Sequence, residues 1–92
     1  MATAARLVVT GKVQMVGYRA WTVREAQRRS LRGWVRNRTD GTVEILAIGD
    51  AIDISSLVTA CRQGPRHAQV QSVERFSAED DGNEGFKQVD SL

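Results

Sequence analysis

The stretch that decides the fold is residues 5–19, which read ARLVVTGKVQMVGYR. Over residues 5–13, β-forming side chains recur with a period of two, and this alternation predicts a strand with one buried face. The inward positions of that strand are Leu7, Val9, Gly11 and Val13. Residues 14–17 break the alternation, so we expect the chain to leave the strand there and enter a loop.

A helix is predicted from Tyr18 to about Ser30, because this segment contains no proline or glycine and is rich in Arg, Glu, Ala and Gln. Its inner stripe, spaced by four residues, consists of Tyr18, Thr22 and Ala26. The loop before it ends at a helix N-terminus, where backbone N–H groups lack helical partners and can bind an anion. The guanidinium of Arg19 would add a bidentate hydrogen-bond donor for phosphate. On position alone, a merely solvated arginine is the commoner interpretation.

Two further strands are predicted over residues 31–38 and 42–49, joined by a hairpin at Asp40-Gly41. Asp50 is the expected N-cap of a second helix, which Gly64-Pro65 ends. The buried face of this helix is predicted to hold Ile54, Leu57, Val58 and Cys61.

The last part of the chain predicts a strand over residues 68–78, a turn over residues 80–84 and a short edge strand over residues 86–90. In the first of these strands, Val70 and Val73 are three residues apart instead of two or four. That spacing predicts a β-bulge between them.

The resulting order, β-α-β-β-α-β with a short tail strand, predicts an α+β fold. Two right-handed crossovers interleave into a ferredoxin-like α/β sandwich, in which both helices cover one face of an antiparallel sheet of order 4-1-3-2 with a short extra edge strand. The first two strands then end at the same sheet edge, which brings the loop of residues 14–18 near Asn37. By position alone, Asn37 either supports the hairpin or orients a water for attack on phosphorus.

Composition is typical of one soluble domain spanning residues 1–92, with 41% hydrophobic and 26% charged residues. The 13 basic and 11 acidic residues leave a net charge of only +2, which does not by itself indicate nucleic-acid binding. One Cys and one His are too few for an intrachain disulfide or a usual zinc site. Residues 1–6 contain no signal-peptide stretch, and no apolar run approaches the ~20 residues of a membrane span. We therefore expect a cytoplasmic, metal-free monomer.

Two motifs resemble the signatures of the acylphosphatase family. Residues 11–19, GKVQMVGYR, are similar to its motif G-[RK]-V-Q-G-V-G-[FY]-R. Residues 33–37, GWVRN, followed by residues 40–44, DGTVE, are similar to its second motif, G-[WY]-V-x-N with D-G-x-V-E. The resemblance covers about residues 6–90 and extends to Gly64-Pro65, Ala68, Val70, Val73 and Gly85-Phe86.

This resemblance implies a hydrolase acting on acid anhydrides, which cleaves the carboxyl–phosphate bond of acyl phosphates without a metal, a cofactor or a covalent phosphoenzyme. Asn37 would position the attacking water. The phosphate would be bound by the segment Gln14, Met15, Val16, Gly17, Tyr18 and Arg19. The partners implied are a small acyl phosphate and inorganic phosphate, not a nucleic acid or a membrane.

The sequence departs from the family pattern at two places. Met15 replaces a glycine of the loop, so it is either strained at positive φ or directed into solvent. Arg29 and Ser30 replace an apolar–Gly pair at the end of the first helix, which affects the helix C-cap and stability more than activity.

Other interpretations depend on the sheet face that carries Trp34, Arg32, Arg36 and Arg38. This face is either solvated, with Arg–Trp stacking, or a docking surface for a nucleic acid or a protein. A regulatory or carbamoyl-phosphate-handling module is a third interpretation, although the short length and lack of linkers favour a free-standing enzyme. We expect neither the buried Cys61 nor the loop residue His67 to be catalytic.

Overall fold

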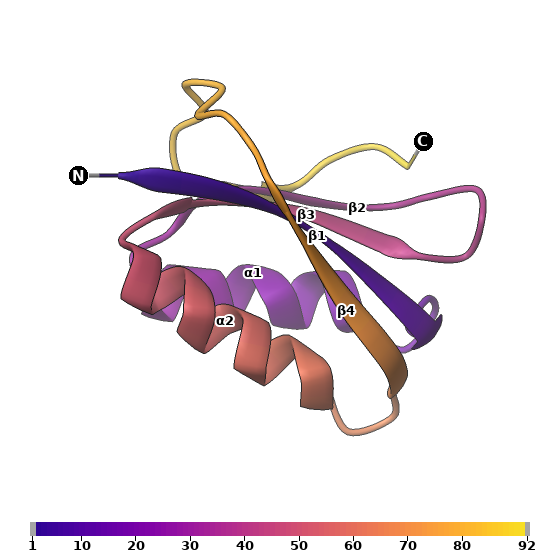
Figure 1. Cartoon of the computed structure of the whole chain (residues 1–92). Helices are drawn as coiled ribbons and strands as arrows, with labels where there is room; N and C mark the ends of the chain where they lie inside the picture. Colours follow the sequence, from indigo (N-terminus) through magenta and orange to yellow (C-terminus); the bar gives the residue numbers. More distant parts are fainter. Residues whose placement is uncertain (1, 92) are drawn as a thin grey trace.

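The computed structural model describes residues 2–91, so Met1 and Leu92, the ends of the predicted domain, lie outside the described residues. The elements have the predicted types and order, although several ends differ by one or two residues (Figure 1). They are β1 (Thr3–Lys12), α1 (Tyr18–Arg28), β2 (Arg32–Asn37), β3 (Val43–Gly49), α2 (Ala51–Gln63), β4 (Gln69–Ser77) and β5 (Phe86–Gln88).

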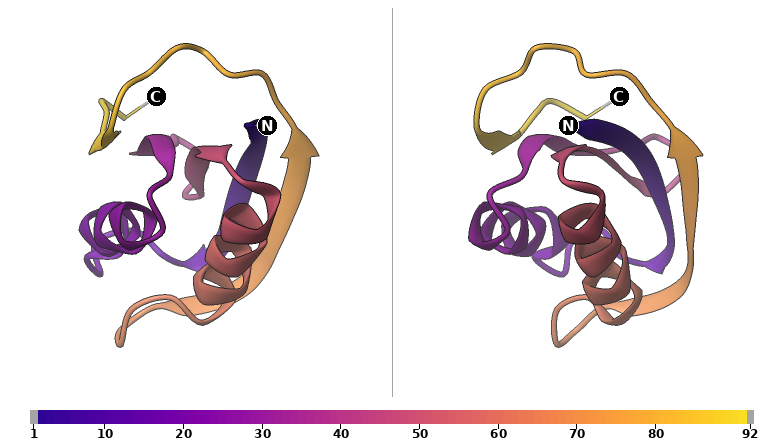
Figure 2. Two further views of the ribbon diagram at one scale, coloured as in Figure 1. Left: turned by 90° about the vertical axis from the view of Figure 1, so that its left-hand side faces the viewer. Right: turned by 60° about the vertical axis from the view of Figure 1, so that its left-hand side comes forward.

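The five strands form one sheet in the order β4-β1-β3-β2-β5. Strands β1 to β4 pair in an antiparallel manner, which confirms the predicted order 4-1-3-2. The tail strand differs from the expectation, because β5 pairs with β2 in a parallel manner and makes the sheet mixed. The cause is the connection after β4, which carries the chain to the opposite edge of the sheet and reverses it (Figure 2). Since β4 and β2 point in opposite directions, a reversed chain runs parallel to β2.

Both helices lie on one face of the sheet, as predicted (Figures 1 and 2). The helix α1 buries Tyr18, Thr22 and Ala26, and α2 buries its predicted stripe from Ile54 to Cys61. These side chains pack against the inward residues of β1, β2 and β3 in one apolar core. Each large aliphatic side chain buried there contributes about 1.5–3 kcal/mol. The core therefore holds the N-terminal end of α1 beside the ends of β1 and β2.

The predicted bulge lies in β4, where the pairing with β1 shifts between Thr10 and Gly11. These two residues face Ser72 and Val70, which leaves Gln71 as the extra residue. An extra residue in one strand bends it and increases its twist. The bulge therefore shapes the sheet just before β1 enters the loop.

The departure from the family pattern at the end of α1 is accommodated by a left-handed residue. Ser30 has φ of 56°, and its N–H bonds the carbonyl of Gln27 at 3.1 Å while that of Leu31 bonds the carbonyl of Ala26 at 3.0 Å. This pair of bonds is a Schellman motif, in which glycine usually occupies the left-handed position. Ser30 thus performs a glycine's role with a Cβ in place.

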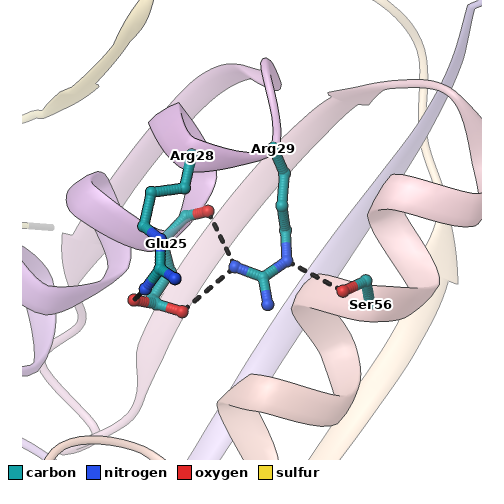
Figure 3. A network of polar contacts seen from close by, with 4 residues as sticks. All are labelled: Glu25, Arg28, Arg29 and Ser56. Carbon is teal, nitrogen blue, oxygen red and sulfur yellow. Dashed lines mark hydrogen bonds and ion pairs between the residues drawn. The ribbon is translucent and has the colours of Figure 1, made fainter.

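The neighbouring Arg29 ties α1 to α2 (Figure 3). Its guanidinium donates to the Ser56 hydroxyl at 2.9 Å and to the backbone carbonyl of Glu25 at 2.9 Å, and it forms an ion pair with the Glu25 carboxylate at 3.0 Å. Arg28 also contacts this carboxylate at 3.0 Å. A charged cluster therefore joins the two helices at the end of α1.

Asp50 occupies the N-cap position of α2, but its side chain makes no capping hydrogen bond. The predicted N-cap residue is therefore confirmed, but it caps the helix without a side-chain hydrogen bond. The exposed carboxylate is left to water, and only the backbone carbonyl of Asp50 takes part, accepting from the N–H of Ile54 at 3.0 Å. The other end of α2 is closed as predicted by Gly64, whose N–H bonds the carbonyl of Ala60 at 2.9 Å.

The sheet face away from the helices shows the predicted stacking of arginine on tryptophan. The guanidinium of Arg36 lies 4.9 Å from the centre of the Trp34 ring, and the indole N–H of Trp34 donates to Asp81 at 3.2 Å. Arg38, predicted to share this face, lies in the hairpin beyond the end of β2. The aromatic surface is thus covered in part by the protein's own charged groups.

The arginines of this face are also paired with carboxylates. Glu44 lies between Arg36 at 2.7 Å and Arg6 at 3.4 Å, and only 7% of its side chain is exposed. Arg32 forms an ion pair with Asp80 in the segment that connects β4 to β5. The positive charge that suggested a nucleic-acid surface is therefore largely neutralised within the chain.

Candidate active site

A hollow of about 170 Å³ opens at the sheet edge where β1 and β2 end. It is smaller than the ~300–1,000 Å³ pockets that enclose drug-sized ligands, so its size suits a small group such as phosphate. The residues that line it are Val13, Met15, Gly17, Tyr18, Arg19, Ala20, Asn37 and Gln88.

The fold brings Arg19 and Asn37 to the same hollow, although they are 18 residues apart in the sequence. Arg19 is the second residue of α1, and Asn37 is the last residue of β2. Both side chains are half-buried. Among the lining residues of the described chain, Arg19 alone carries a charge. The hollow is therefore suited to an anion.

The backbone at the start of α1 adds further donors. Gly17 is the N-cap residue, with φ of 80°, and as a glycine it has no side chain to cap the first N–H groups. The first turn contains no acidic residue, so the partial positive charge of the helix end is not compensated locally. These N–H groups remain available to an anion beside Arg19.

Met15 has a positive φ and also directs its side chain into solvent, which were the two alternatives predicted for this position. It has φ of 62°, in the region that glycine tolerates best, and its side chain is 101% exposed. A residue with a Cβ is strained in this conformation by roughly 1–2 kcal/mol. The loop therefore makes a left-handed turn at Met15 and carries a fully solvated methionine on it.

Gln14 and Val16 are not among the residues that line the hollow. The side-chain amide of Gln14 instead donates to the backbone carbonyls of Arg38 and Thr42, at 2.9 Å each. Val16 packs against the hydrophobic core. These two residues anchor the loop on either side of Met15, and a contact from their backbone N–H groups to phosphate stays a prediction.

The carboxamide of Asn37 contains a buried oxygen, Oδ1, with no hydrogen-bond partner among residues 2–91. Buried polar atoms without a partner are uncommon and each asks for an explanation. A site that binds water or substrate would provide one. The amide NH₂ group then remains for contacts inside the hollow.

Tyr18 links this site to the second helix, because its buried hydroxyl donates to the backbone carbonyl of Cys61 at 2.7 Å. Burial raises the pKa of Tyr18, so the hydroxyl stays protonated as a donor. Burial also raises the pKa of the Cys61 thiol to about 11. A thiol protonated at neutral pH is a poor nucleophile, and neither it nor the exposed His67 lines the hollow.

Sequence reasoning missed Gln88 as a residue of this hollow. Gln88 is the last residue of β5 and is paired with Val35, two residues before Asn37 on β2. Because β5 is parallel to β2, its final residue reaches the same sheet edge as Asn37. The direction of a three-residue edge strand carries no local sequence signal that could have revealed this.

Residues 2–91 contain no group of three or more His, Cys, Asp or Glu side chains placed to hold a metal ion. Nor do they include a helix with the length and apolar character needed to cross a membrane.

Comparison with known proteins identifies the family. The acylphosphatase family profile matches residues 5–88. An acylphosphatase of Acidiphilium cryptum (strain JF-5) is 47% identical over 83 residues, which are 90% of this chain and 91% of that protein. The crystal structure of acylphosphatase from Bacillus subtilis has a TM-score of 0.90 and 39% identity, and the match covers 97% of this chain and 99% of that one.

The same fold also occurs within a larger protein. Full-length HypF, crystallised in a phosphate- and nucleotide-bound form, has a TM-score of 0.91 and 25% identity to this chain. That match covers 99% of this chain but only 12% of HypF. The family profile and the relatives that match over at least nine-tenths of both chains together show that this chain belongs to the acylphosphatase family.

Proposed function

We propose that the hollow is the active site in which this acylphosphatase hydrolyses its substrate. Arg19 and the backbone N–H groups of residues 14–19 bind the phosphoryl group, and Asn37 holds the attacking water. The supporting observation is that Arg19, the uncapped start of α1 and Asn37 all border one phosphate-sized hollow.

The chemistry requires positioning and charge stabilisation more than acid–base strength. The water oxygen forms a bond to phosphorus while the bond to the acyl oxygen breaks, and the electron pair leaves with the carboxylate. An acyl phosphate dianion and water thus become a carboxylate and dihydrogen phosphate. A carboxylate leaves readily, so fixed donors around the phosphoryl oxygens supply much of the catalysis.

Asn37 is neutral and cannot act as a strong base. We propose that a phosphoryl oxygen of the substrate takes the proton of the attacking water. The pH dependence of kcat should then show no ionisation of an enzyme base. A bell-shaped profile with the pKa of a protein carboxyl or imidazole group would contradict this step.

We further propose that this chemistry needs no metal ion or cofactor, because Arg19 and the helix end provide the positive charge. The chain would act as a single-domain monomer in the cytoplasm on small acyl phosphates, without a nucleic-acid or membrane partner. Hydrolysis of benzoyl phosphate should persist in EDTA, and the protein should elute from a sizing column as one chain. Loss of activity in EDTA, restored by an added metal, would contradict the metal-free mechanism.

The roles of the two side chains are tested with Arg19→Ala and Asn37→Ala. We expect Arg19→Ala to weaken competitive inhibition by inorganic phosphate by about tenfold or more, because a charged hydrogen-bond donor is lost, and to lower kcat as well. Asn37→Ala should lower kcat by roughly 10²-fold, with little change in phosphate inhibition.

The control is Arg24→Ala, which removes an exposed arginine of α1 that does not line the hollow. It should behave like the wild type. Near-wild-type hydrolysis by Arg19→Ala or Asn37→Ala, in protein that unfolds at the normal urea concentration, would overturn the proposed roles.

A further inference from the structure

We propose that Met15 contacts the acyl group of the substrate and that the rim of the hollow selects uncharged, apolar acyl groups. The rim consists of the exposed lining residues, Met15, Gly17, Ala20 and Gln88. The inference rests on the proposed function, because it takes the hollow as the phosphate site. It extends that function from the phosphoryl group, common to all substrates, to the part that distinguishes one substrate from another.

The size of the hollow leaves part of a large acyl group at its mouth. Its volume of about 170 Å³ is below the ~300–1,000 Å³ of pockets that enclose a whole drug-sized ligand, so a substrate such as benzoyl phosphate is not fully enclosed. In-line attack also places the leaving group on the side of phosphorus away from the water. Asn37 ends β2, and Met15 lies in the loop between β1 and α1, so the two residues come to the hollow from different segments. The proposal places the acyl group beside the loop, away from the water that Asn37 holds.

Met15 has no role in the fold that explains its side chain. It is fully exposed and lines the hollow, whereas the next residue, Val16, packs against the core. It also holds a left-handed backbone conformation that glycine would adopt without strain. An unbranched thioether adapts its shape to different apolar partners. Contact with an apolar acyl group would bury surface that is otherwise in water.

The rest of the rim is uncharged. Ala20 and Gln88 present a methyl and a neutral amide, and Arg19, the one cation among the lining residues of the described chain, serves the phosphoryl group. A second anionic group on the acyl portion would lose water without gaining a cation. The favoured substrates are therefore aromatic or aliphatic acyl phosphates without a second carboxylate or phosphate.

The contact is tested by comparing benzoyl phosphate with acetyl phosphate in Met15→Gln and Met15→Leu. Both variants keep a Cβ and the same backbone strain, and they differ from each other in polarity. Met15→Gln should lower the ratio of kcat/KM for benzoyl over acetyl phosphate by about fivefold. Met15→Leu should keep the ratio within about twofold, because its side chain stays apolar.

The loss should lie in KM and not in kcat, because a contact remote from phosphorus is made equally in the bound substrate and the transition state. An unchanged ratio in Met15→Gln, or an equal loss with both substrates, would overturn the acyl contact. If Arg19→Ala lowers kcat and weakens phosphate inhibition while the ratio stays unchanged in Met15→Gln, this inference fails and the proposed function stands. If Arg19→Ala hydrolyses benzoyl phosphate at a near-wild-type rate, the proposed function itself fails.

The charge of the rim is tested with butyryl and succinyl phosphate, which have acyl chains of equal length and differ in a terminal carboxylate. Wild-type kcat/KM should be higher for butyryl phosphate by about tenfold, and Gln88→Lys should narrow that difference by adding a cation to the rim. Equal kcat/KM values for the two substrates in the wild type would contradict selection against charged acyl groups.

Discussion

The side-chain nitrogen of Gln14 lies 2.9 Å from the backbone carbonyl oxygen of Arg38, the residue that follows Asn37. The same nitrogen also donates to the carbonyl of Thr42 at 2.9 Å, so both of its hydrogens are used on the hairpin. These two bonds connect the loop that leads to Arg19 with the strand end that carries Asn37. They set the distance between the two halves of the proposed site.

We therefore expect Gln14→Leu to affect both stability and turnover. Two partly buried hydrogen bonds of about 1 kcal/mol each are lost, while each carbonyl keeps a backbone donor, the N–H of Gly41 for Arg38 and the N–H of Arg38 for Thr42. The free energy of unfolding should therefore fall by roughly 1–2 kcal/mol. Turnover of benzoyl phosphate should fall by about tenfold, because small misplacements of catalytic groups are costly. Urea unfolding and steady-state kinetics measure the two effects. A variant that keeps the wild-type kcat would show that the two hydrogen bonds of Gln14 do not position Asn37.

The hydroxyl of Tyr18 gives a second prediction. It donates to the carbonyl of Cys61, which lies in the last turn of α2 and cannot find a helical partner there. Tyr18→Phe should lower the free energy of unfolding by about 1–3 kcal/mol, because a buried acceptor is left unsatisfied. Cys61→Ser keeps the backbone carbonyl, so combining it with Tyr18→Phe should leave the cost of losing the hydroxyl largely intact. Equal stability of Tyr18→Phe and the wild type would contradict this account of the α1–α2 contact.

Ser30 gives a prediction of increased stability. Its φ of 56° strains a residue with a Cβ. Its side chain is exposed, so removing the side chain costs no packing in the core. Ser30→Gly should raise the free energy of unfolding by about 0.5–1 kcal/mol, since relief of strain exceeds the added entropy of the unfolded chain. Ser30→Ala retains the Cβ and should give no such gain. A lower urea midpoint for Ser30→Gly than for Ser30→Ala would refute the strain argument.

Glu25 makes stability dependent on acid pH. Partial burial raises the pKa of this carboxyl, but the hydrogen bond from Arg29 and the charge of Arg28 outweigh burial and leave its pKa below the ordinary value (Figure 3). The folded state therefore binds this proton less tightly than the unfolded chain, whose Glu pKa is about 4.3. The stabilisation is present in full above that pH and is lost as the pH falls through the lower pKa of the folded state.

Glu25→Gln should thus be less stable than the wild type at pH 7, and the difference should shrink at pH 3. Urea unfolding at the two pH values measures it. Glu79→Gln, at an exposed position outside this cluster, is the control and should show a small difference at both. If the loss of unfolding free energy in Glu25→Gln is as large at pH 3 as at pH 7, the ionisation of Glu25 does not account for the pH dependence of stability.

Much of the fold could be predicted from the sequence because its signals are local. The alternation of residues 5–13, the stripe of Tyr18, Thr22 and Ala26 and the three-residue spacing of Val70 and Val73 each depend on a short segment. The structure confirms the strand, the buried helix face and the bulge. Element order then leaves few ways to connect the strands, so the placement of Arg19 and Asn37 at one edge also followed.

What the sequence determined by itself is therefore the element order, the buried faces and the chemical character of the loop. Only the tertiary structure decided that the Gln14 side chain bonds the hairpin, that the Asp50 side chain makes no capping hydrogen bond and that β5 brings Gln88 to the hollow. Each of these outcomes depends on a partner that is distant along the chain, or on competition with water at an exposed group. Periodicity records which face of an element is buried, but not which distant atom will complete a hydrogen bond or in which direction a short edge strand will run.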